Sequence, residues 1–523
     1  MHYFLRNRWH LALLPLLLML YQSVNGASEM WEYTVIPGDT LIGVANIYMA
    51  NPADWPELQR LNGITEPKRI PRGTRLRIPV TWLKQAPVVA TVLRLQGSVE
   101  KIAALASVAT PLALGEHVAV GESITTGAGS NVSLRFADGS RLLVTEKTHL
   151  TFTRMIMFGK TGMAQTAIEL NGGEVESLVV PQAAPASRYE VITPTLNLGV
   201  RGTHFRVRFA PSAQQVHTEV QNGGVLATGA GVSVKVDSEF GTFATENEPP
   251  APPQKLLPAP DLSEVSKRVE RLPLRLSWPE LTGAEAYRVQ LFADRSFEQL
   301  LRDTLFTGNS ATWQDLPDGR YVLRVRGVDG SRLEGMDNDH DFVVKTQPAA
   351  PFVIAPLNGS KLYGTEVTFR WGAALLAHKY HFQLARSATF TERVVDESIA
   401  NNTERVVAIP PGQYYWRIAT IAAKNDRGPY SDTQAFELGK TPTTERPEPD
   451  QSTTPPSAPV TKSMIPTSPS GEILPEEQFQ PPSASPTPSP TNVAEPDMLL
   501  LLLLGVTAIY LFSWRQTARK KRL

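Results

Sequence analysis

The chain has 523 residues, with 51 basic and 51 acidic side chains and no cysteine. This length exceeds what one hydrophobic core supports, so it predicts several folded units. The balanced charge provides no overall field that would attract nucleic acid. The lack of cysteine excludes disulfides, thiolate metal sites and a thiol nucleophile.

The first 26 residues have the pattern of a secretory signal peptide. Arg6 and Arg8 precede an apolar run from Leu11 to Leu20, and small residues follow around Gly26. The run is about half the roughly 20 residues that a membrane span needs. We therefore expect export with cleavage near Gly26, and an uncleaved anchor is the alternative.

The segment after the signal peptide predicts a short strand, a sharp turn and a helix. The extended run from Tyr33 ends at Gly38, which allows the backbone to turn. Asp39 or Thr40 is placed to cap a helix that begins near Leu41. Amides at the start of that helix would be free to donate hydrogen bonds.

Two further elements complete this unit. Residues 41–48 keep a helical spacing of apolar side chains, and a second helix is predicted over Pro52–Leu61. A turn and a strand follow over Ile70–Pro79. The predicted order is β-α-α-β within about fifty residues.

Residues 31–80 resemble the lysin motif (LysM) domain. The stretches YTVIPGDTLIGVA, WPELQRLNGI and IPRGTRLRIP occur in the order and spacing of that family. The resemblance implies binding of N-acetylglucosamine-containing glycan, chiefly peptidoglycan, in a shallow groove between two loops. The residues that it assigns to the groove are Gly38, Asp39, Thr40, Leu41, Asn62, Gly63 and Ile64.

Leu41 and Ile64 are expected to offer apolar contact to the N-acetyl methyl group of such a glycan. A structural role is the alternative for the same positions. In that case Asp39 and Thr40 only cap the helix, and Leu41 only fills the core.

The block over residues 87–245 is predicted to be β-rich. Residues 131–144, NVSLRFADGSRLLV, form a hairpin pattern with Val132, Leu134 and Phe136 on one face. Further glycine turns are predicted at residues 171–173 and 222–224. The pattern favours a β-roll, a sandwich or a short solenoid.

Four stretches of this block resemble the FecR family: GSVE (97–100), residues 112–140, LNGGEVE (170–176) and VITPTLNLGVRGTHFRV (191–207). In that family the periplasmic domain belongs to signalling regulators of iron uptake, in which an anti-sigma segment and a membrane helix precede the β domain. Here a signal peptide and another module stand in those positions. What the resemblance implies is an exported β domain whose ligand is unassigned, for which a periplasmic protein is one possible partner.

The next part of the chain is a repeat with an offset of 93 residues. The positions that recur are Trp278, Tyr287, Phe297, Gly319, Tyr321 and Arg324, as Trp371, Tyr380, Phe390, Gly412, Tyr414 and Arg417. Short alternating runs with turn residues between them predict two β-sandwiches, over residues 262–345 and 350–440. Both resemble fibronectin type III domains, which commonly act as spacers or bind proteins.

The C-terminal segment predicts a spacer and an anchor. Residues 441–497 contain 15 prolines in 57 residues, which is typical of a disordered, extended linker. Residues 498–514 are uncharged and long enough for a transmembrane helix. The basic tail over residues 515–523 predicts a cytoplasmic end, so the helix would anchor the exported part in an inner membrane. A sorting signal that is removed after export is the alternative.

No catalytic pattern stands out. His378 and His381 lie where a strand is predicted to begin, so their side chains would point to opposite faces. The acidic run over residues 337–341 hints at a calcium loop, but Phe342 stands where glycine is needed. A pair of carboxylates for glycan hydrolysis is not excluded by the sequence, because the two members of such a pair can lie far apart in the chain and meet only in the fold.

The sequence thus predicts a multidomain, mainly β, non-enzymatic protein of the periplasm that binds peptidoglycan, with no cofactor, metal or nucleic acid. A FecR-type sensor and a wall hydrolase with unrecognised carboxylates are the rival hypotheses.

Overall fold

The computed structural model describes residues 29–440, apart from residue 107 and residues 182–185. The described chain is mainly β, with two α-helices. The predicted signal peptide, proline-rich linker, transmembrane helix and basic tail lie outside the described residues. Among the helices that are described, none has the length and apolar character needed to cross a bilayer.

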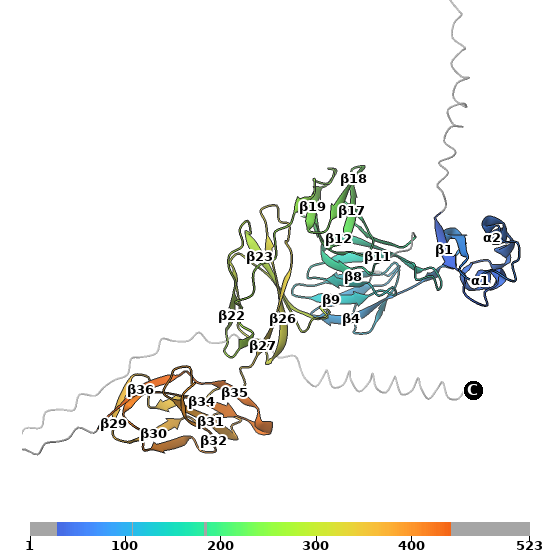
Figure 1. The fold of residues 1–523 in the computed structure, drawn as a ribbon. Coiled ribbons are helices and arrows are strands. Elements are labelled where there is room, and N and C mark those ends of the chain that lie inside the picture. The colour runs from blue at the N-terminus through green and yellow to red at the C-terminus, as the bar shows by residue number, and fades with distance from the viewer. Residues whose placement is uncertain (1–28, 107, 182–185, 441–523) are drawn as a thin grey trace, which may run out of the picture. The chain divides into compact units, whose positions relative to one another are not determined.

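The N-terminal unit has the predicted β-α-α-β order (Figure 1). Its elements are β1 (Met30–Thr34), α1 (Leu41–Tyr48), a 3-10 turn (Pro52–Asp54), α2 (Trp55–Asn62) and β2 (Arg75–Pro79), and β1 pairs antiparallel with β2. Both helices have eight residues and are too short to be stable in isolation. Burial of their apolar faces against β2 therefore holds them in place.

The core of the N-terminal unit continues into the next part of the chain. Phe158, Met163 and Ala186 pack into the same buried cluster as Leu41 and Leu58. An ion pair between Arg188 and Glu29 at 2.8 Å lies beside this contact. The N-terminal unit therefore packs against the residues that follow it and shares a buried core with them.

Residues 86–255 form two connected sheets, which we call the large β unit. One sheet contains β3 (Ala86–Pro87), β5 (Val99–Ile102), β6 (Ala109–Pro111), β8 (Ser123–Thr126), β11 (His149–Met157), β13 (Arg188–Ile192), β14 (Asn197–Val200), β17 (Gly224–Gly229) and β18 (Val232–Asp237). The other contains β4 (Ala90–Gln96), β7 (His117–Val118), β9 (Asn131–Arg135), β10 (Arg141–Val144), β15 (His204–Ala210), β16 (Gln215–Asn222), β19 (Phe240–Thr245) and β20 (Gln254–Lys255).

Strand β12 (Ala164–Leu178) belongs to both sheets. Its first part pairs with β11 and β13, and residues 173–178 pair with β10 and β15. The predicted turn at residues 171–173 is therefore wrong, because these residues lie inside one continuous strand. Gly173 has φ of +91°, so it lets the strand bend from one sheet into the other without ending.

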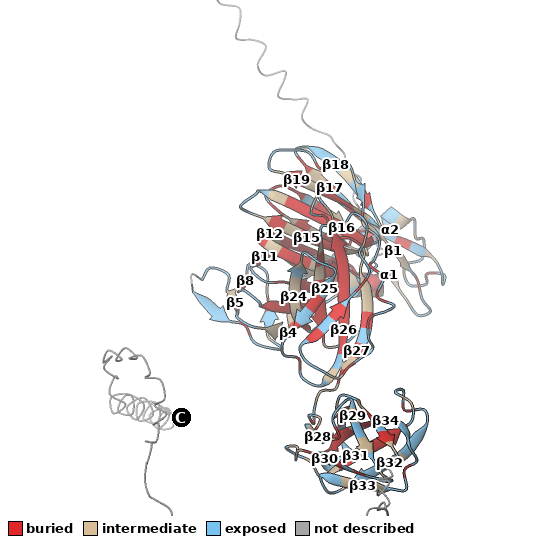
Figure 2. Cartoon of the chain, turned by 90° about the vertical axis from the view of Figure 1, so that its left-hand side faces the viewer, coloured by how far each residue is buried: buried red, intermediate tan, exposed pale blue. Residues whose placement is uncertain are grey.

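The predicted hairpin over residues 131–144 is confirmed as β9 and β10. Val132, Leu134 and Phe136 are all buried on the core side, as the alternation requires. The core between the sheets includes Phe152 and Tyr189, which meet Phe136 edge to face. Figure 2 shows this buried interior along β12, β15 and β16.

Two smaller units of two sheets each follow. The first sandwich contains β21 (Arg268–Val269), β22 (Leu274–Ser277), β23 (Ala286–Phe292), β24 (Leu300–Phe306), β25 (Ser310–Trp313), β26 (Gly319–Val328) and β27 (Asn338–Val344). The second contains β28 (Val353–Ala355), β29 (Ser360–Tyr363), β30 (Glu366–Trp371), β31 (Lys379–Ala385), β32 (Arg393–Ile399), β33 (Thr403–Val407), β34 (Gly412–Ile421), β35 (Arg427–Tyr430) and β36 (Gln434–Gly439).

The 93-residue repeat holds at the level of single contacts. The hydroxyl of Tyr321 donates to the carbonyl of Pro317 at 2.8 Å, and Tyr414 donates to Pro410 at 2.8 Å. The predicted core tryptophans are buried in both copies. The two sandwiches are therefore structural repeats, so equivalent positions on their surfaces can be compared.

Candidate functional site

The two loops that the sequence assigns to the glycan groove lie next to each other. One is the strand–helix loop, residues 35–40, and the other is the helix–strand loop, residues 63–74. The amide of Leu41 donates to the carbonyl of Pro67 at 2.8 Å, and the amide of Val35 donates to Thr74 at 2.9 Å. These bonds fix the spacing between the loops.

Side-chain hydrogen bonds shape the strand–helix loop. The Thr40 hydroxyl accepts from the amide of Gly43 at 3.0 Å and so caps α1. The Asp39 carboxylate accepts from the Tyr33 hydroxyl at 2.7 Å and from the amide of Ile36 at 2.8 Å. Gly38 has φ of +95° and is exposed. Thr40 caps the helix, and Asp39 braces the loop from inside.

Leu41 does not reach the groove surface. Its side chain is fully buried in the core, so the expected contact with an N-acetyl methyl group is not available to it. Its neighbour Ile42, at the first turn of α1, is 38% exposed. Ile64, on the facing loop, is half-buried and packs against the core of the unit.

Asn62 and Gly63, on the other side of the predicted groove, have structural roles. The Asn62 side chain accepts from the amide of Arg77 at 2.6 Å and donates to the carbonyl of Arg77 at 2.9 Å. Gly63 ends α2 with φ of +61°, a left-handed conformation that favours glycine. Asn62 thus ties the end of α2 to β2, and Gly63 directs the chain into the helix–strand loop.

Hydrogen-bond donors are available at the start of α1. Among the described residues, the amides of Thr40 and Ile42 have no hydrogen-bond partner. Free amides at a helix start are donors for a carbonyl oxygen. The start of α1 therefore presents two donors next to the exposed side chain of Ile42.

An aromatic cluster that the sequence did not reveal as part of the site supports the loop. Trp31, Tyr33 and Tyr48 lie with ring centroids 4.9 to 5.7 Å apart. Burial and the hydrogen bond to Asp39 raise the pKa of Tyr33 above its usual value. The Tyr33 hydroxyl therefore stays protonated and keeps donating to the loop.

A second candidate region is a cluster of ionised side chains buried between the large β unit and the first sandwich. We call it the junction cluster: Glu174, Glu176, Arg206, Arg208 and Glu219 from the large β unit, and Arg288, Asp303, Arg324, Arg326, Glu334, Asp337 and Asp339 from the sandwich. Seven carboxylates thus face five arginines. The sequence signal for it was pairs of like charge two residues apart on a strand, as in Arg324 and Arg326, which point to one face.

Different neighbours shift the pKa values of two carboxyls of the cluster in opposite directions. Burial and the nearby Glu334 raise the pKa of Glu174 to about 7. Burial also disfavours the charged form of Glu176, but the hydrogen bond with His204 and the charge of Arg324 outweigh it and lower the pKa of Glu176. Glu174 is therefore a carboxyl of the cluster whose pKa lies near neutral pH.

This titration predicts a pH dependence of stability. Between about pH 4.5 and 7 the folded protein holds a proton on Glu174 that the unfolded chain has lost, so the free energy of unfolding should fall as pH rises. Glu174→Gln should flatten that slope, measured by denaturant unfolding at pH 5 and pH 8. Glu146→Gln, at a side chain that is 43% exposed, should leave the slope unchanged. An equal slope in the Glu174 variant and the wild type would contradict the assignment.

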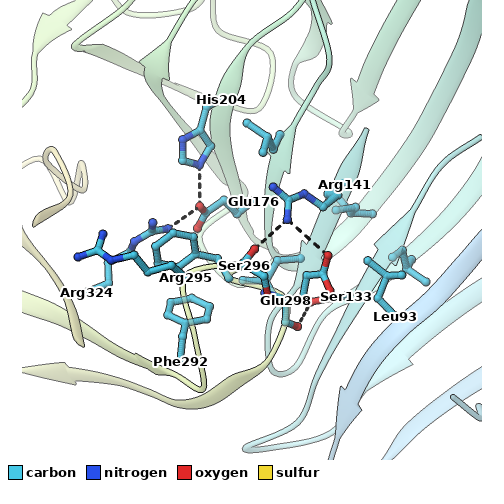
Figure 3. A pocket seen from close by; sticks show the side chains of 15 residues that line it. Leu93, Ser133, Arg141, Glu176, His204, Phe292, Arg295, Ser296, Glu298 and Arg324 are labelled. Atoms are coloured by element: carbon cyan, nitrogen blue, oxygen red, sulfur yellow. Dashed lines mark hydrogen bonds and ion pairs between the residues drawn. The ribbon is translucent and has the colours of Figure 1, made fainter. Parts of the chain in front are cut away.

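A cavity of about 330 Å³ lies beside the junction cluster (Figure 3). Its walls carry apolar side chains together with the chain of contacts from His204 to Glu176 at 2.7 Å and on to Arg324 at 3.1 Å. Arg141 and Arg295, also on its wall, pair with Glu298 and Asp341. The arginines of the wall are thus already paired within the protein.

No group of three acidic or histidine side chains in the described part of the chain is arranged to hold a metal ion. Asp337 and Asp339, from the acidic run considered for calcium, instead pair with Arg326 and Arg324 at 3.0 and 2.8 Å. His381, the strand histidine, lies 3.1 Å from Asp396.

Two family models match this chain. Residues 33–79 match the model of the LysM domain, and residues 122–226 match the model of the FecR protein. Both resemblances inferred from sequence are thereby confirmed at the level of the family. The two matches point to the cell envelope and to binding of N-acetylglucosamine-containing glycan.

Solved structures give more distant likenesses. A putative anti-sigma factor from Parabacteroides distasonis shares 14% identity over 25% of this chain and 59% of its own, with a TM-score of 0.22. The FN1–FN3 domains of chicken CNTN1 share 13% sequence identity, and the match covers 45% of this chain and 97% of the CNTN1 chain, with a TM-score of 0.19. Fibronectin(III)-like modules of Clostridium thermocellum CbhA share 12% sequence identity, and the match covers 35% of this chain and 94% of the CbhA chain, with a TM-score of 0.17. Comparison with curated proteins gives no match.

Proposed function

We propose that this chain is a non-enzymatic cell-envelope protein that binds peptidoglycan through the groove between the strand–helix loop and the helix–strand loop. The observation that carries the proposal is the bond from Leu41 to Pro67, which holds the two loops together around free donors and apolar side chains. The LysM match over residues 33–79 supports the ligand class.

The groove suits an N-acetyl group. The free amides of Thr40 and Ile42 would donate to the acetamido carbonyl, and Ile42 and Ile64 would contact the methyl group. Neutral donors and apolar contacts make up this recognition. Binding should therefore change little with salt, in contrast to binding that depends on charge.

The remaining parts fit an envelope role. Export by the signal peptide and retention by the C-terminal apolar segment would hold the protein at the inner membrane, with glycan bound at its other end. The large β unit and the sandwiches would then present surfaces to other proteins between wall and membrane.

Co-sedimentation of the full-length protein with insoluble peptidoglycan tests the proposal. Ile42→Glu should lower the bound fraction at least about tenfold, because a desolvated charge would replace an apolar contact in the groove. Ile47→Glu is the matched control: it lies on the same helix and is 44% exposed, but it is not at the first turn. Equal sedimentation of both variants and the wild type would overturn the groove assignment.

A sensor is the second candidate, and the FecR match over residues 122–226 is the observation that favours it. A sensor requires a specific protein partner bound through the large β unit. Affinity purification of the full-length protein from envelope extracts, with and without cross-linking, would recover one partner in stoichiometric amount if the sensor hypothesis holds. Recovery of the same partner with a variant that lacks residues 87–245 would contradict the sensor hypothesis.

A further inference from the structure

The first sandwich shows how one face of this fold binds a protein surface. Its strands β23 and β26 lie against strand β12 of the large β unit, and Arg324 pairs with Glu176 of β12 at 3.1 Å. The Arg324 guanidinium stacks on the Phe297 ring with its carbon 4.0 Å from the ring centroid. Arg324 also pairs with Asp339 of its own sandwich at 2.8 Å. A stacked arginine with carboxylate partners thus anchors the contact.

The second sandwich repeats the stacked arginine without its carboxylates. Arg417, 93 residues after Arg324, lies over the Phe390 ring at 3.9 Å and over the Tyr430 ring at 4.0 Å. Its only hydrogen bond in the described chain is from Nε to the side chain of Gln383 at 2.8 Å. Both terminal nitrogens of Arg417 are therefore free to bind a ligand.

The loss of carboxylates follows from the strand register. In the first sandwich Val328 pairs with Glu334, and the equivalent pair in the second is Ile421 with Arg427. An acidic residue of the junction cluster is thus replaced by a basic one.

The same comparison explains the absence of an internal partner for Arg417. Leu323 pairs with His340 in the first sandwich, and Trp416 pairs with Gln434 in the second. This pairing puts Thr433 at the position of Asp339. Arg417 has therefore lost both the carboxylate of its own sandwich and the one supplied by a neighbouring unit.

The surroundings of Arg417 add a second cation. The Arg427 guanidinium lies 5.1 Å from the same Tyr430 ring and contacts the Tyr430 hydroxyl at 3.1 Å. Arg427 is exposed and has no ion pair within the described residues. His381 and Arg393 also face this region, and both pair with Asp396.

One further carboxylate acts on this region from a distance. Burial lowers the pKa of Arg417, and Glu270, from the first sandwich, partly offsets this shift without an ion-pair contact. Strands β31 and β34 carry no acidic residue, Arg417 is half-buried on β34, and Arg427 beside it is exposed (Figure 2 shows the burial of this sandwich).

We propose that Arg417 and Arg427, which share contact with the Tyr430 ring, form a carboxylate-binding site. Its occupant is an acidic side chain of a protein partner that docks on β31 and β34, as Glu176 of β12 docks on Arg324. A planar guanidinium held between two rings is pre-oriented for two parallel hydrogen bonds to a carboxylate. The stacking also holds Arg417 in place before the partner arrives, which lowers the entropy lost on binding.

Fluorescence anisotropy of the full-length protein with a short labelled peptide of alternating Glu and Val tests the site. The expected result is salt-sensitive binding that weakens at least about tenfold in Arg417→Gln, equivalent to about 1.4 kcal/mol. Arg427→Gln should weaken it in the same direction, and because Arg427 is exposed this variant keeps its fold.

Two controls make the outcome decisive. A peptide of alternating Gln and Val should not bind, and Arg405→Gln, an exposed arginine paired with Glu366 in the other sheet, should bind the Glu peptide like the wild type. Equal binding of the two peptides, or unchanged binding in both arginine variants of the site, would overturn the proposal. Absence of any binding of the Glu peptide to the wild type would also overturn it.

Discussion

Arg326→Ala is expected to destabilise the protein by about 3 to 5 kcal/mol. The Arg326 side chain is fully buried and lies 2.9 Å from Glu334 and 3.0 Å from Asp337. Its removal leaves two buried carboxylates without their counter-charge, and the cluster already has more carboxylates than arginines. Denaturant unfolding followed by tryptophan fluorescence measures the loss.

Arg295→Ala is the matched control for this prediction. Arg295 is 54% exposed and forms an ion pair with Asp341 in the same sandwich. Exposed pairs contribute about 0 to 1 kcal/mol, so this variant should unfold almost as the wild type does. A loss below about 1 kcal/mol in both variants would show that the junction cluster does not hold the two units together.

Gly173→Ala is the second substitution expected to have a large effect, of about 2 to 4 kcal/mol. A β-carbon at this position would lie 2.4 Å from the Cα of Thr148, which is backbone and cannot turn away. The φ of +91° adds strain for any residue with a side chain. The bend of β12 between the two sheets would have to open, and the melting temperature should fall accordingly.

Gly129→Ala is the control that distinguishes the steric clash with Thr148 from the backbone strain of a positive φ. Gly129 has φ of +64° in the same unit, but a β-carbon there would meet nothing within 4 Å. It should cost only the strain of a left-handed residue, about 1 kcal/mol. Equal melting temperatures of Gly129→Ala and Gly173→Ala would show that the close approach of the Thr148 backbone is not the reason that β12 requires glycine at position 173.

Local patterns were sufficient where an element depends on its own residues. The β-α-α-β order, the hairpin of β9 and β10 and the 93-residue repeat all follow from spacing within a few turns or strands. The turn predicted at residues 171–173 failed because a glycine pair is typical of both a turn and a bend within a strand. Only the pairing partners β10 and β15 decide between the two.

The glycan-binding roles of the groove residues stay a prediction from the LysM resemblance. Thr40 caps α1 and Leu41 fills the core, which agrees with the structural alternative that the sequence left open for these two positions. The junction cluster was missed because its members come from strands far apart in the chain. Alternating like charges on β15 and β26 were its one visible sign.

The central claim is that the groove beside α1 recognises the N-acetyl group of a wall glycan. Isothermal titration of the full-length protein with N-acetylglucosamine oligomers and with the matching deacetylated glucosamine oligomers tests it directly. We predict heat of binding for the acetylated oligomers, no binding of the deacetylated ones, and loss of the first in Ile42→Glu. Binding of both oligomers with equal affinity, or of neither, would contradict the account.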